Sequence, residues 1–284
     1  MEYIWSITGR CDLNCKYCWD PYKKYDQLSY EECCSLIDRL VEDDCSMLIF
    51  TGGEPTMHDN FFDIVKYTSQ KGINNLKVCT NGFRLPFFRD LYVQSALNEI
   101  HISVNRAEEI LNRKDVNEFV ETLQALKVAN KKVMFVSIID IFNQDNYVSV
   151  LKLAEKLGIT VMFQFMAKTD DKVIKCLADL TKEEKGILFK NIEMIHSQYK
   201  KHIDTYTFSY YDVAKKYYLQ GIVPEYCYAD SKYRVISPKG EIFPCYWKKR
   251  KDCSTNECFT DKCLVWFRYN KRIERVYQML SGEK

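Results

Sequence analysis

The sequence predicts an α/β fold with a parallel sheet, because short β-rich runs alternate with amphipathic helical segments along most of the chain. Six apolar runs have the length of strands that are buried on both faces. They cover residues 3–8, 47–51, 76–80, 99–104, 133–139 and 159–165. Six strand–helix units are too few to close an eight-stranded barrel. We therefore expect a partial (β/α)6 barrel of the TIM type, with right-handed crossovers.

Capping signals mark the helices between and after these runs. Ser29 and Glu32 form a capping box for a helix that runs to about Asp44, and Asp59 begins a helix that Gly72 ends. Thr181 and Glu184 repeat the capping box further along the chain. The remaining helices are expected over residues 115–130, 144–157, 181–201 and 208–220.

The pattern of strand–helix units changes after Phe165, and we expect the boundary of a C-terminal module near residue 221. Residues 233–237 and 241–244 are typical of a β-hairpin, because Pro238 and Gly240 supply its turn. We expect two domains, a barrel with its following helices over residues 1–220 and a small hairpin-containing module over residues 221–284.

Composition and charge narrow the class of protein. The chain has 284 residues, of which 46% are apolar and 28% are charged, as in ordinary globular proteins. The 41 basic residues nearly balance the 39 acidic ones, which gives no support for a partner that is nucleic acid or a membrane surface. No apolar run reaches the length of a membrane helix, and the N-terminus lacks the pattern of a signal peptide. We expect a cytoplasmic protein.

The cysteines form two clusters and a scattered set. Cytosolic thiols stay reduced, so 13 cysteines indicate metal or redox chemistry rather than disulfides. One cluster is near the start of the chain and one near its end. Their members are Cys11, Cys15 and Cys18, and Cys227, Cys245, Cys253, Cys258 and Cys263. The scattered residues, for which inert buried thiols are the expectation, are Cys33, Cys34, Cys45, Cys79 and Cys176.

The first cluster lies in the loop directly after the first strand. Three thiolates on a short loop can bind three irons of a [4Fe–4S] cluster and leave the fourth iron open to a substrate. Zinc is the alternative, but a structural zinc site is closed by four ligands. The loop offers neither a fourth cysteine nor a nearby histidine.

The spacing CX3CX2C after the first strand resembles the radical S-adenosylmethionine (SAM) superfamily. A second motif, Gly52-Gly53-Glu54-Pro55, follows the second strand, where this family carries its GGEP motif. The resemblance implies that this segment binds the amino group of SAM, with Glu54 adding a carboxylate. Glycines permit a close approach of the backbone to a ligand. Without the family, the two glycines are only a turn.

Further segments of residues 3–170 match the family. The turn Thr80-Asn81-Gly82 ends the third strand where the family borders its SAM site, and Ser103 lies on the strand that contacts SAM. Tyr17 stands where the family places an aromatic residue against the adenine; loop packing is the alternative. The frequent Ser-x-Asp-Gly ending is absent, since Asn105 and Arg106 stand there, which leaves Asn105 a weaker assignment than Ser103.

The resemblance implies a specific reaction. The reduced cluster gives one electron to SAM, which yields methionine and a 5′-deoxyadenosyl radical that takes a hydrogen atom from an unactivated C–H bond. The cofactor carries this chemistry, so no acid–base pair is needed for the first step, and no catalytic side chain is assigned. An electron donor such as flavodoxin or ferredoxin is the implied partner.

The second cysteine cluster resembles the SPASM and twitch modules that follow many radical SAM domains. Cys227 and Cys245 flank Gly240, which occupies the matching hairpin position. Too few cysteines follow for two auxiliary clusters. One auxiliary [4Fe–4S] cluster is implied, held by these two residues and two of Cys253, Cys258 and Cys263. A structural zinc knuckle is the alternative, because thiolates bind both metals.

Three functions remain open. One is a maturase that modifies a peptide by crosslinking, epimerisation or oxidation, as many SPASM-bearing relatives do. A second is a dehydrogenase of a small molecule such as an aminocyclitol, sugar or nucleoside. A third is a non-catalytic iron–sulfur or zinc protein, against which the GGEP segment argues, since a carrier needs no SAM site.

Overall fold

A computed structural model describes residues 1–15, 18, 27–139, 141, 143–165, 176–222 and 232–244. Within these residues the sheet has the strand order β6-β5-β4-β3-β2-β1-β7-β8. The first six strands alternate with helices along the chain. The α/β class with six parallel strands, consistent with a partial TIM-type barrel, is therefore confirmed.

The chain divides into two units, and each is described by itself. Unit 1 comprises Met1–Ser103, Leu111–Met134 and Asp230–Lys249, and unit 2 comprises Val104–Ile110, Phe135–Ala229 and Arg250–Lys284. The predicted domain boundary at residue 221 stays a prediction, because most of the chain beyond it lies outside the described residues.

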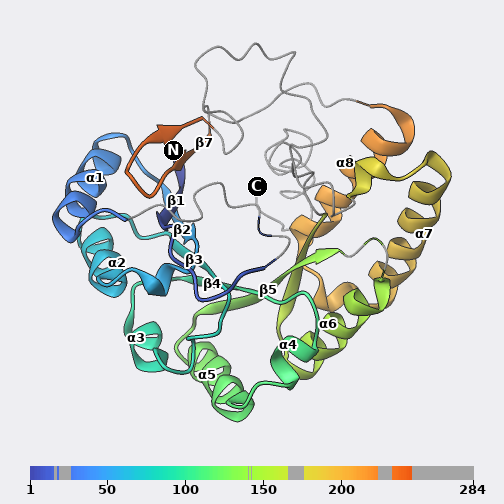
Figure 1. Cartoon of the computed structure of the whole chain (residues 1–284), viewed down its shortest axis with the longest axis horizontal. Coiled ribbons are helices and arrows are strands. Elements are labelled where there is room, and N and C mark those ends of the chain that lie inside the picture. The colour runs from blue at the N-terminus through green and yellow to red at the C-terminus, as the bar shows by residue number, and fades with distance from the viewer. Residues whose placement is uncertain are drawn as a thin grey trace. The chain divides into compact units, whose positions relative to one another are not determined.

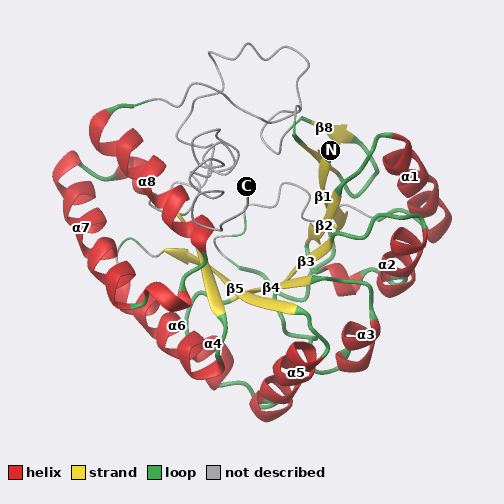
Figure 2. Cartoon of the chain, turned by 180° about the vertical axis from the view of Figure 1, so that it is seen from behind, coloured by secondary structure: helices red, strands yellow, loops and turns green. Residues whose placement is uncertain are grey.

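Unit 1 contains four parallel strands with helices between them. The strands are β1 (Glu2–Thr8), β2 (Met47–Gly52), β3 (Leu76–Thr80) and β4 (Glu99–Ser103). The helices are α1 (Tyr30–Glu42), α2 (Phe61–Gln70), α3 (Arg89–Gln94) and α5 (Val116–Val128). These helices lie along one side of the strands (Figures 1 and 2). The sheet residues on that side, such as Trp5, Phe50 and Ile100, are fully buried.

Unit 2 holds the later strand and most of the later helices. Its elements are α4 (Glu108–Leu111), α6 (Gln144–Leu157), β6 (Thr160–Phe165), α7 (Lys182–Gln198) and α8 (Thr205–Gln220). Strand β5 (Lys132–Ile139) is shared between the units. The side chain of Thr181 accepts a hydrogen bond from the backbone of Glu184 and caps α7 as predicted, and Gly158 ends α6 in a left-handed conformation.

The predicted hairpin is present and joins the sheet of unit 1. Strands β7 (Tyr233–Ile236) and β8 (Ile242–Phe243) pair antiparallel, and β7 pairs in parallel with β1. The hydroxyl of Ser237 accepts hydrogen bonds from the backbone of Lys239 and Glu241, both at 3.2 Å, and Gly240 has φ +78°. The local sequence predicts the hairpin but not its pairing with β1.

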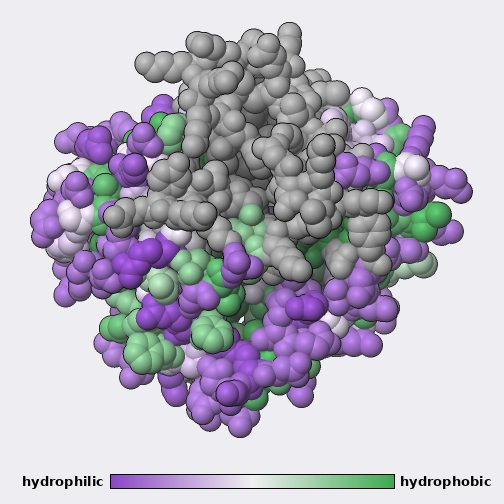
Figure 3. Space-filling model, in the orientation of Figure 1, coloured by the Kyte–Doolittle hydropathy of each residue, from purple (hydrophilic) through white to green (hydrophobic). Residues whose placement is uncertain are grey.

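The surface of the described helices is mainly polar, with one apolar concentration in unit 1. Hydrophobic side chains gather over α3 in Figure 3, where Phe83, Phe87 and Leu91 are exposed. None of the helices in the described ranges combines the length and apolarity that crossing a membrane requires.

Candidate functional site

The three cysteines of the first cluster lie in the loop that follows β1, here called the cysteine loop (residues 9–18). The side chains of Cys11 and Cys18 are exposed and that of Cys15 is half-buried. The backbone N–H of Leu13 donates to the Cys11 sulfur at 3.5 Å, and that of Cys18 donates to the Cys15 carbonyl at 3.2 Å. Although Cys11 is exposed, the protein around its sulfur removes enough water to raise the pKa of the thiol.

The three thiols of the cysteine loop are ligands of the kind that an iron–sulfur cluster takes. In the described parts of the chain, no three His, Cys, Asp or Glu side chains converge closely enough to hold one metal ion. A [4Fe–4S] cluster takes one thiolate at each of three separate irons, so it does not require the thiolates to converge. Three thiolates therefore fit a cluster with one open iron.

The GGEP segment packs directly against the cysteine loop. The N–H of Gly53 donates to the Thr8 carbonyl and that of Glu54 donates to the Arg10 carbonyl, both at 2.8 Å. A Cβ atom on Gly53 would lie 2.1 Å from the Arg10 carbonyl oxygen, and Gly52 has φ +124°. The close approach that the glycines permit is thus an approach to the chain itself. Their contact with SAM stays a prediction.

Glu54 is fully buried and joins three segments. One carboxylate oxygen accepts from the N–H and the hydroxyl of Thr56, at 3.2 and 2.8 Å. The other accepts from the N–H of Asn81 at 2.8 Å, and the Thr80 hydroxyl lies 2.9 Å from both oxygens. No cation is among these partners, and burial raises the pKa of Glu54. The carboxylate that we expected at the SAM amino group is directed at Thr56, Thr80 and Asn81.

The turn after β3 is joined to the cysteine loop by a side-chain hydrogen bond. The amide nitrogen of Asn81 donates to Asp12 at 2.7 Å, and its amide oxygen accepts from the N–H of Phe83 at 2.7 Å. Asp12 lies between Cys11 and Cys15 in the sequence, and the motif alone gave no sign of its role. Three predicted motifs, at the ends of β1, β2 and β3, therefore meet at one corner of unit 1.

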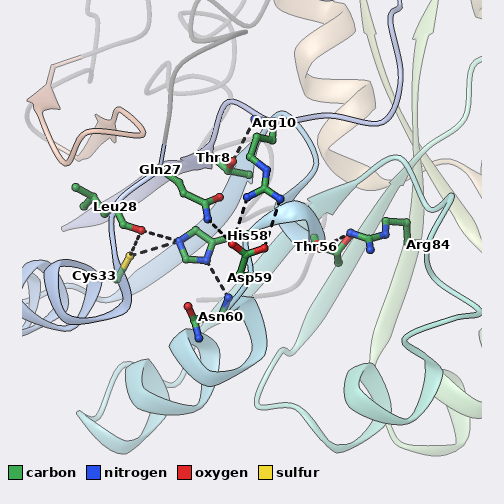
Figure 4. Close-up of polar contacts among 10 residues, drawn as sticks. All are labelled: Thr8, Arg10, Gln27, Leu28, Cys33, Thr56, His58, Asp59, Asn60 and Arg84. Carbon is green, nitrogen blue, oxygen red and sulfur yellow. Dashed lines mark hydrogen bonds and ion pairs between the residues drawn. The ribbon is translucent and has the colours of Figure 1, made fainter.

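The other side of this corner is braced by residues that sequence reasoning missed (Figure 4). Arg10 forms an ion pair with Asp59 at 3.3 Å. His58 is buried, its Nε2 lies 3.1 Å from the Leu28 carbonyl, and its Nδ1 accepts from the N–H of Asn60 at 3.2 Å. One ring nitrogen therefore donates and the other accepts, which describes a neutral imidazole. Burial lowers the pKa of His58, in agreement with that state.

The remaining predicted site residues divide into described and undescribed ones. Pro55 is buried and begins a short 3₁₀ helix (Pro55–Met57), and Ser103 is exposed at the end of β4. Asn105, the weaker assignment, accepts a hydrogen bond from the N–H of Ile138 at 2.8 Å within unit 2. Those outside the described residues are Tyr17, Cys227, Cys245, Cys253, Cys258 and Cys263.

The scattered cysteines are only partly as predicted. Cys33 and Cys176 are buried, whereas Cys34, Cys45 and Cys79 are half-buried. Burial raises the pKa of Cys33 to about 12 and that of Cys45 to about 11, as for inert thiols. Cys79 differs, because the parallel pairing of β3 and β4 places His101 beside it.

A family profile described as Radical SAM superfamily matches residues 5–157. Sequence relatives include a GTP 3′,8-cyclase of Campylobacter jejuni subsp. doylei, 25% identical over 265 residues, which span 85% of this chain and 79% of that protein. A GTP 3′,8-cyclase of Aquifex aeolicus is 28% identical over 172 residues, 56% of this chain and 54% of that protein. The chain thus matches about half the length of the Aquifex relative.

Solved structures share the fold. Streptococcus suis SuiB bound to the precursor peptide SuiA superposes with a TM-score of 0.63 at 14% identity, covering 97% of this chain and 66% of SuiB. The protein anSMEcpe with bound AdoMet gives a TM-score of 0.60 at 15% identity, covering 97% of this chain and 82% of that one. At such identities the likeness extends to the fold alone.

Proposed function

Because this chain belongs to the radical SAM superfamily, we propose that Cys11, Cys15 and Cys18 bind a [4Fe–4S] cluster at which SAM is cleaved reductively. The meeting of three strand-end motifs at one corner of unit 1 carries this proposal. Gly53 bonds to Thr8 at the end of β1, Glu54 bonds to Arg10 of the cysteine loop, and Asn81 bonds to Asp12. A CX3CX2C loop that arose by chance would not be expected to make these contacts with the other two motifs.

The residues of this chain position the reactants. When bound, the cluster and SAM supply a 5′-deoxyadenosyl radical that takes a hydrogen atom from a C–H bond. The backbone of Gly52 and Gly53, together with Asn81 and Ser103, would bind SAM, and Tyr17 would cover its adenine. Glu54 fixes the Thr80–Asn81 turn through buried hydrogen bonds, so it acts on SAM by orienting its neighbours.

The direct test is SAM cleavage by the anaerobically reconstituted and reduced protein, with 5′-deoxyadenosine and methionine measured by mass spectrometry. The wild type should form both slowly without substrate. Cys15→Ala should form neither, because the cluster loses a thiolate, whereas Cys45→Ala should match the wild type. Formation of 5′-deoxyadenosine by a Cys11, Cys15 and Cys18 triple Ala variant contradicts the proposal.

A second part of the proposal concerns residues 221–284. We infer an auxiliary [4Fe–4S] cluster with Cys227, Cys245 and two of Cys253, Cys258 and Cys263 as ligands. The wild type should then hold about eight irons, and the first-cluster triple variant about four. Four irons together with one zinc in the wild type would favour the zinc alternative.

For the substrate, we propose a peptide, so that the enzyme acts as a maturase that crosslinks, epimerises or oxidises it. SuiB, which shares the fold over 97% of this chain, is bound to a precursor peptide in its structure. The candidate from another class is a nucleotide or other small molecule, favoured by the relatives named GTP 3′,8-cyclase. A flavodoxin or ferredoxin would supply the electron in either case.

Turnover separates the two substrate classes. The reduced enzyme should be incubated with SAM and either peptides from neighbouring genes or a panel of nucleotides and aminocyclitols. A peptide substrate should raise the rate of 5′-deoxyadenosine formation and change in mass. Acceleration by a nucleotide alone would favour the small-molecule enzyme.

A further inference from the structure

Strands β3 and β4 place polar residues side by side on one face of the sheet of unit 1. In their parallel register Lys77 lies beside Glu99, and Cys79 lies beside His101. Residues two apart on a strand share a face. His101 therefore lies one pleat, roughly 7 Å, from Ser103 at the end of β4, and Cys79 lies beside His101.

This face is the one turned away from the helices of unit 1. The alternate residues Val78, Ile100 and Ile102 are fully buried. A Cβ atom on Gly82 would lie 2.6 Å from Ile102 and 3.5 Å from Phe119 of α5, which places the side chain of Ile102 on the helix side. Cys79 and His101 consequently face the side on which Ser103 would meet SAM.

The imidazole of His101 is held by charged neighbours. Its Nε2 lies 2.9 Å from a carboxylate oxygen of Glu99, which also pairs with Lys77 at 3.0 Å and with Lys132 at 3.6 Å. His101 itself is only 4% exposed. Burial lowers its pKa, but hydrogen bonding to Cys79 and Glu99 raises it more, so the pKa lies above its ordinary value.

A half-buried thiol beside an imidazole whose pKa is raised has chemistry that an inert thiol lacks. An S–H bond is weaker than an ordinary C–H bond, so a thiol gives its hydrogen atom readily to a carbon radical. An adjacent imidazolium can return a proton to the sulfur. Glu99 accepts from Nε2 and keeps that nitrogen protonated.

We propose that Cys79 donates a hydrogen atom to a carbon radical formed at the SAM site, with His101 as the group that reprotonates its sulfur. This inference rests on the proposed function. The S–H bond breaks and a C–H bond forms, which leaves a thiyl radical. One electron from a low-potential iron–sulfur or flavin donor and one proton from His101 restore the thiol, and His101 regains its proton from solvent.

Deuterium provides a test that needs no substrate. The wild type, Cys79→Ala, Cys79→Ser and Cys45→Ala are reduced with Ti(III) citrate and given SAM in D₂O, without any added thiol. A thiol exchanges its hydrogen with solvent, whereas carbon-bound hydrogen does not. The wild type and Cys45→Ala should form 5′-deoxyadenosine that carries one deuterium, and both Cys79 variants should lose that label.

The outcomes separate this inference from the proposed function. If the wild type forms no 5′-deoxyadenosine, the proposed function fails. If it forms an unlabelled product, or if Cys79→Ser labels its product as the wild type does, the role of Cys79 is overturned. Cys79→Ser preserves the size of the side chain and guards against a folding defect, which thermal melting would reveal.

A second readout tests His101 as a positioning residue without turnover. Alkylation of a cysteine requires its sulfur to lose the proton, and His101 is the neighbour to which the proposal gives the role of taking and returning that proton. Iodoacetamide should alkylate Cys79 faster than the half-buried Cys45, as measured by peptide mass spectrometry. His101→Gln should slow the alkylation of Cys79 and leave that of Cys45 unchanged. Equal rates at Cys79 in the wild type and His101→Gln would overturn the role of His101.

Discussion

Glu54 and Glu99 are two buried carboxylates of unit 1 whose surroundings differ in kind. Glu54 is fully buried and accepts only from backbone N–H groups and hydroxyls, and burial raises its pKa. Glu99 has an 18% exposed side chain beside Lys77, His101 and Lys132. Burial opposes ionisation there too, but His101 and the lysines outweigh it, so its pKa falls to about 2. Burial raises the pKa of both carboxylates, but at the less buried Glu99 the cationic partners outweigh it, so the two pKa values shift in opposite directions.

The difference indicates two roles. Neutral donors around Glu54 fix the relative position of three loops. Glu99, itself paired with two lysines, holds the imidazole of His101 beside a thiol, which is an arrangement suited to proton movement. Substitutions in each region should therefore have different consequences, and they are ordered below by expected effect.

Gly53→Ala should have the largest effect on stability, because it disrupts the contact between the GGEP segment, which contains Glu54, and the cysteine loop. The new Cβ would lie 2.1 Å from the backbone oxygen of Arg10, which no side-chain rotation can relieve. We expect a loss of at least about 3 kcal/mol in the free energy of unfolding, together with loss of cluster iron. Gly186→Ala is the matched control: its Cβ meets open space in α7, and a helical Ala should stabilise by up to about 1 kcal/mol. Equal melting temperatures would contradict the close approach.

Glu54→Gln should have the next largest effect on stability. A side-chain amide keeps one acceptor oxygen but turns an NH₂ group toward donors such as the N–H of Asn81. We expect a loss of about 2–4 kcal/mol at neutral pH, because buried donors are left unsatisfied. Since the pKa of Glu54 is raised, its ionisation costs stability as the pH rises through that pKa. Urea titrations should therefore show that Glu54→Gln lowers the free energy of unfolding at acidic pH as well as at neutral pH.

Glu99→Gln should lower the free energy of unfolding by about 2 kcal/mol at pH 7, because it leaves Lys77 and Lys132 without a counter-charge. The depressed pKa means that this stabilisation is complete above about 4.5 and is lost as the pH falls toward about 2. The difference between wild type and variant should thus shrink in that window, opposite to Glu54→Gln. If the stability difference between wild type and Glu99→Gln stays constant from pH 7 to pH 2.5, the proposed electrostatic difference between Glu54 and Glu99 is wrong.

Lys132→Met should have the smallest effect. The lysine side chain is 49% exposed and lies 3.6 Å from Glu99, so solvent screens the pair. We expect the free energy of unfolding, measured by chemical denaturation, to change by no more than about 0.5 kcal/mol. A loss comparable to that of Glu99→Gln would show that the Glu99 cluster acts as one cooperative network.

Much of the fold follows from local sequence signals. The capping boxes at Ser29 and Thr181 and the left-handed Gly158 begin or end helices where predicted, because each acts within a few residues. The pairing of β7 with β1 does not follow, because a four-residue strand finds its neighbour through contacts distant in sequence. The sequence predicts the strand but not its place in the sheet.

The site shows the same division. The motifs that contain Cys11, Gly53 and Asn81 can be recognised from the sequence, because each lies within a few consecutive residues. The bond between Asp12 and Asn81 and the bracing ion pair of Arg10 with Asp59 join residues tens of positions apart. Glu54 was correctly placed in its motif, but its partners depend on the packing of three loops. Cys79 was interpreted as inert, because His101 becomes its neighbour only when β3 and β4 pair.

The most direct test of the central claim is the electron paramagnetic resonance spectrum of the reduced protein before and after addition of SAM. An open iron in a cluster held by Cys11, Cys15 and Cys18 predicts a [4Fe–4S]⁺ signal whose g-values change when SAM binds. Cys15→Ala should show no SAM-dependent signal, and Cys45→Ala should behave as the wild type. A cluster signal in the wild type that SAM leaves unchanged would contradict the account.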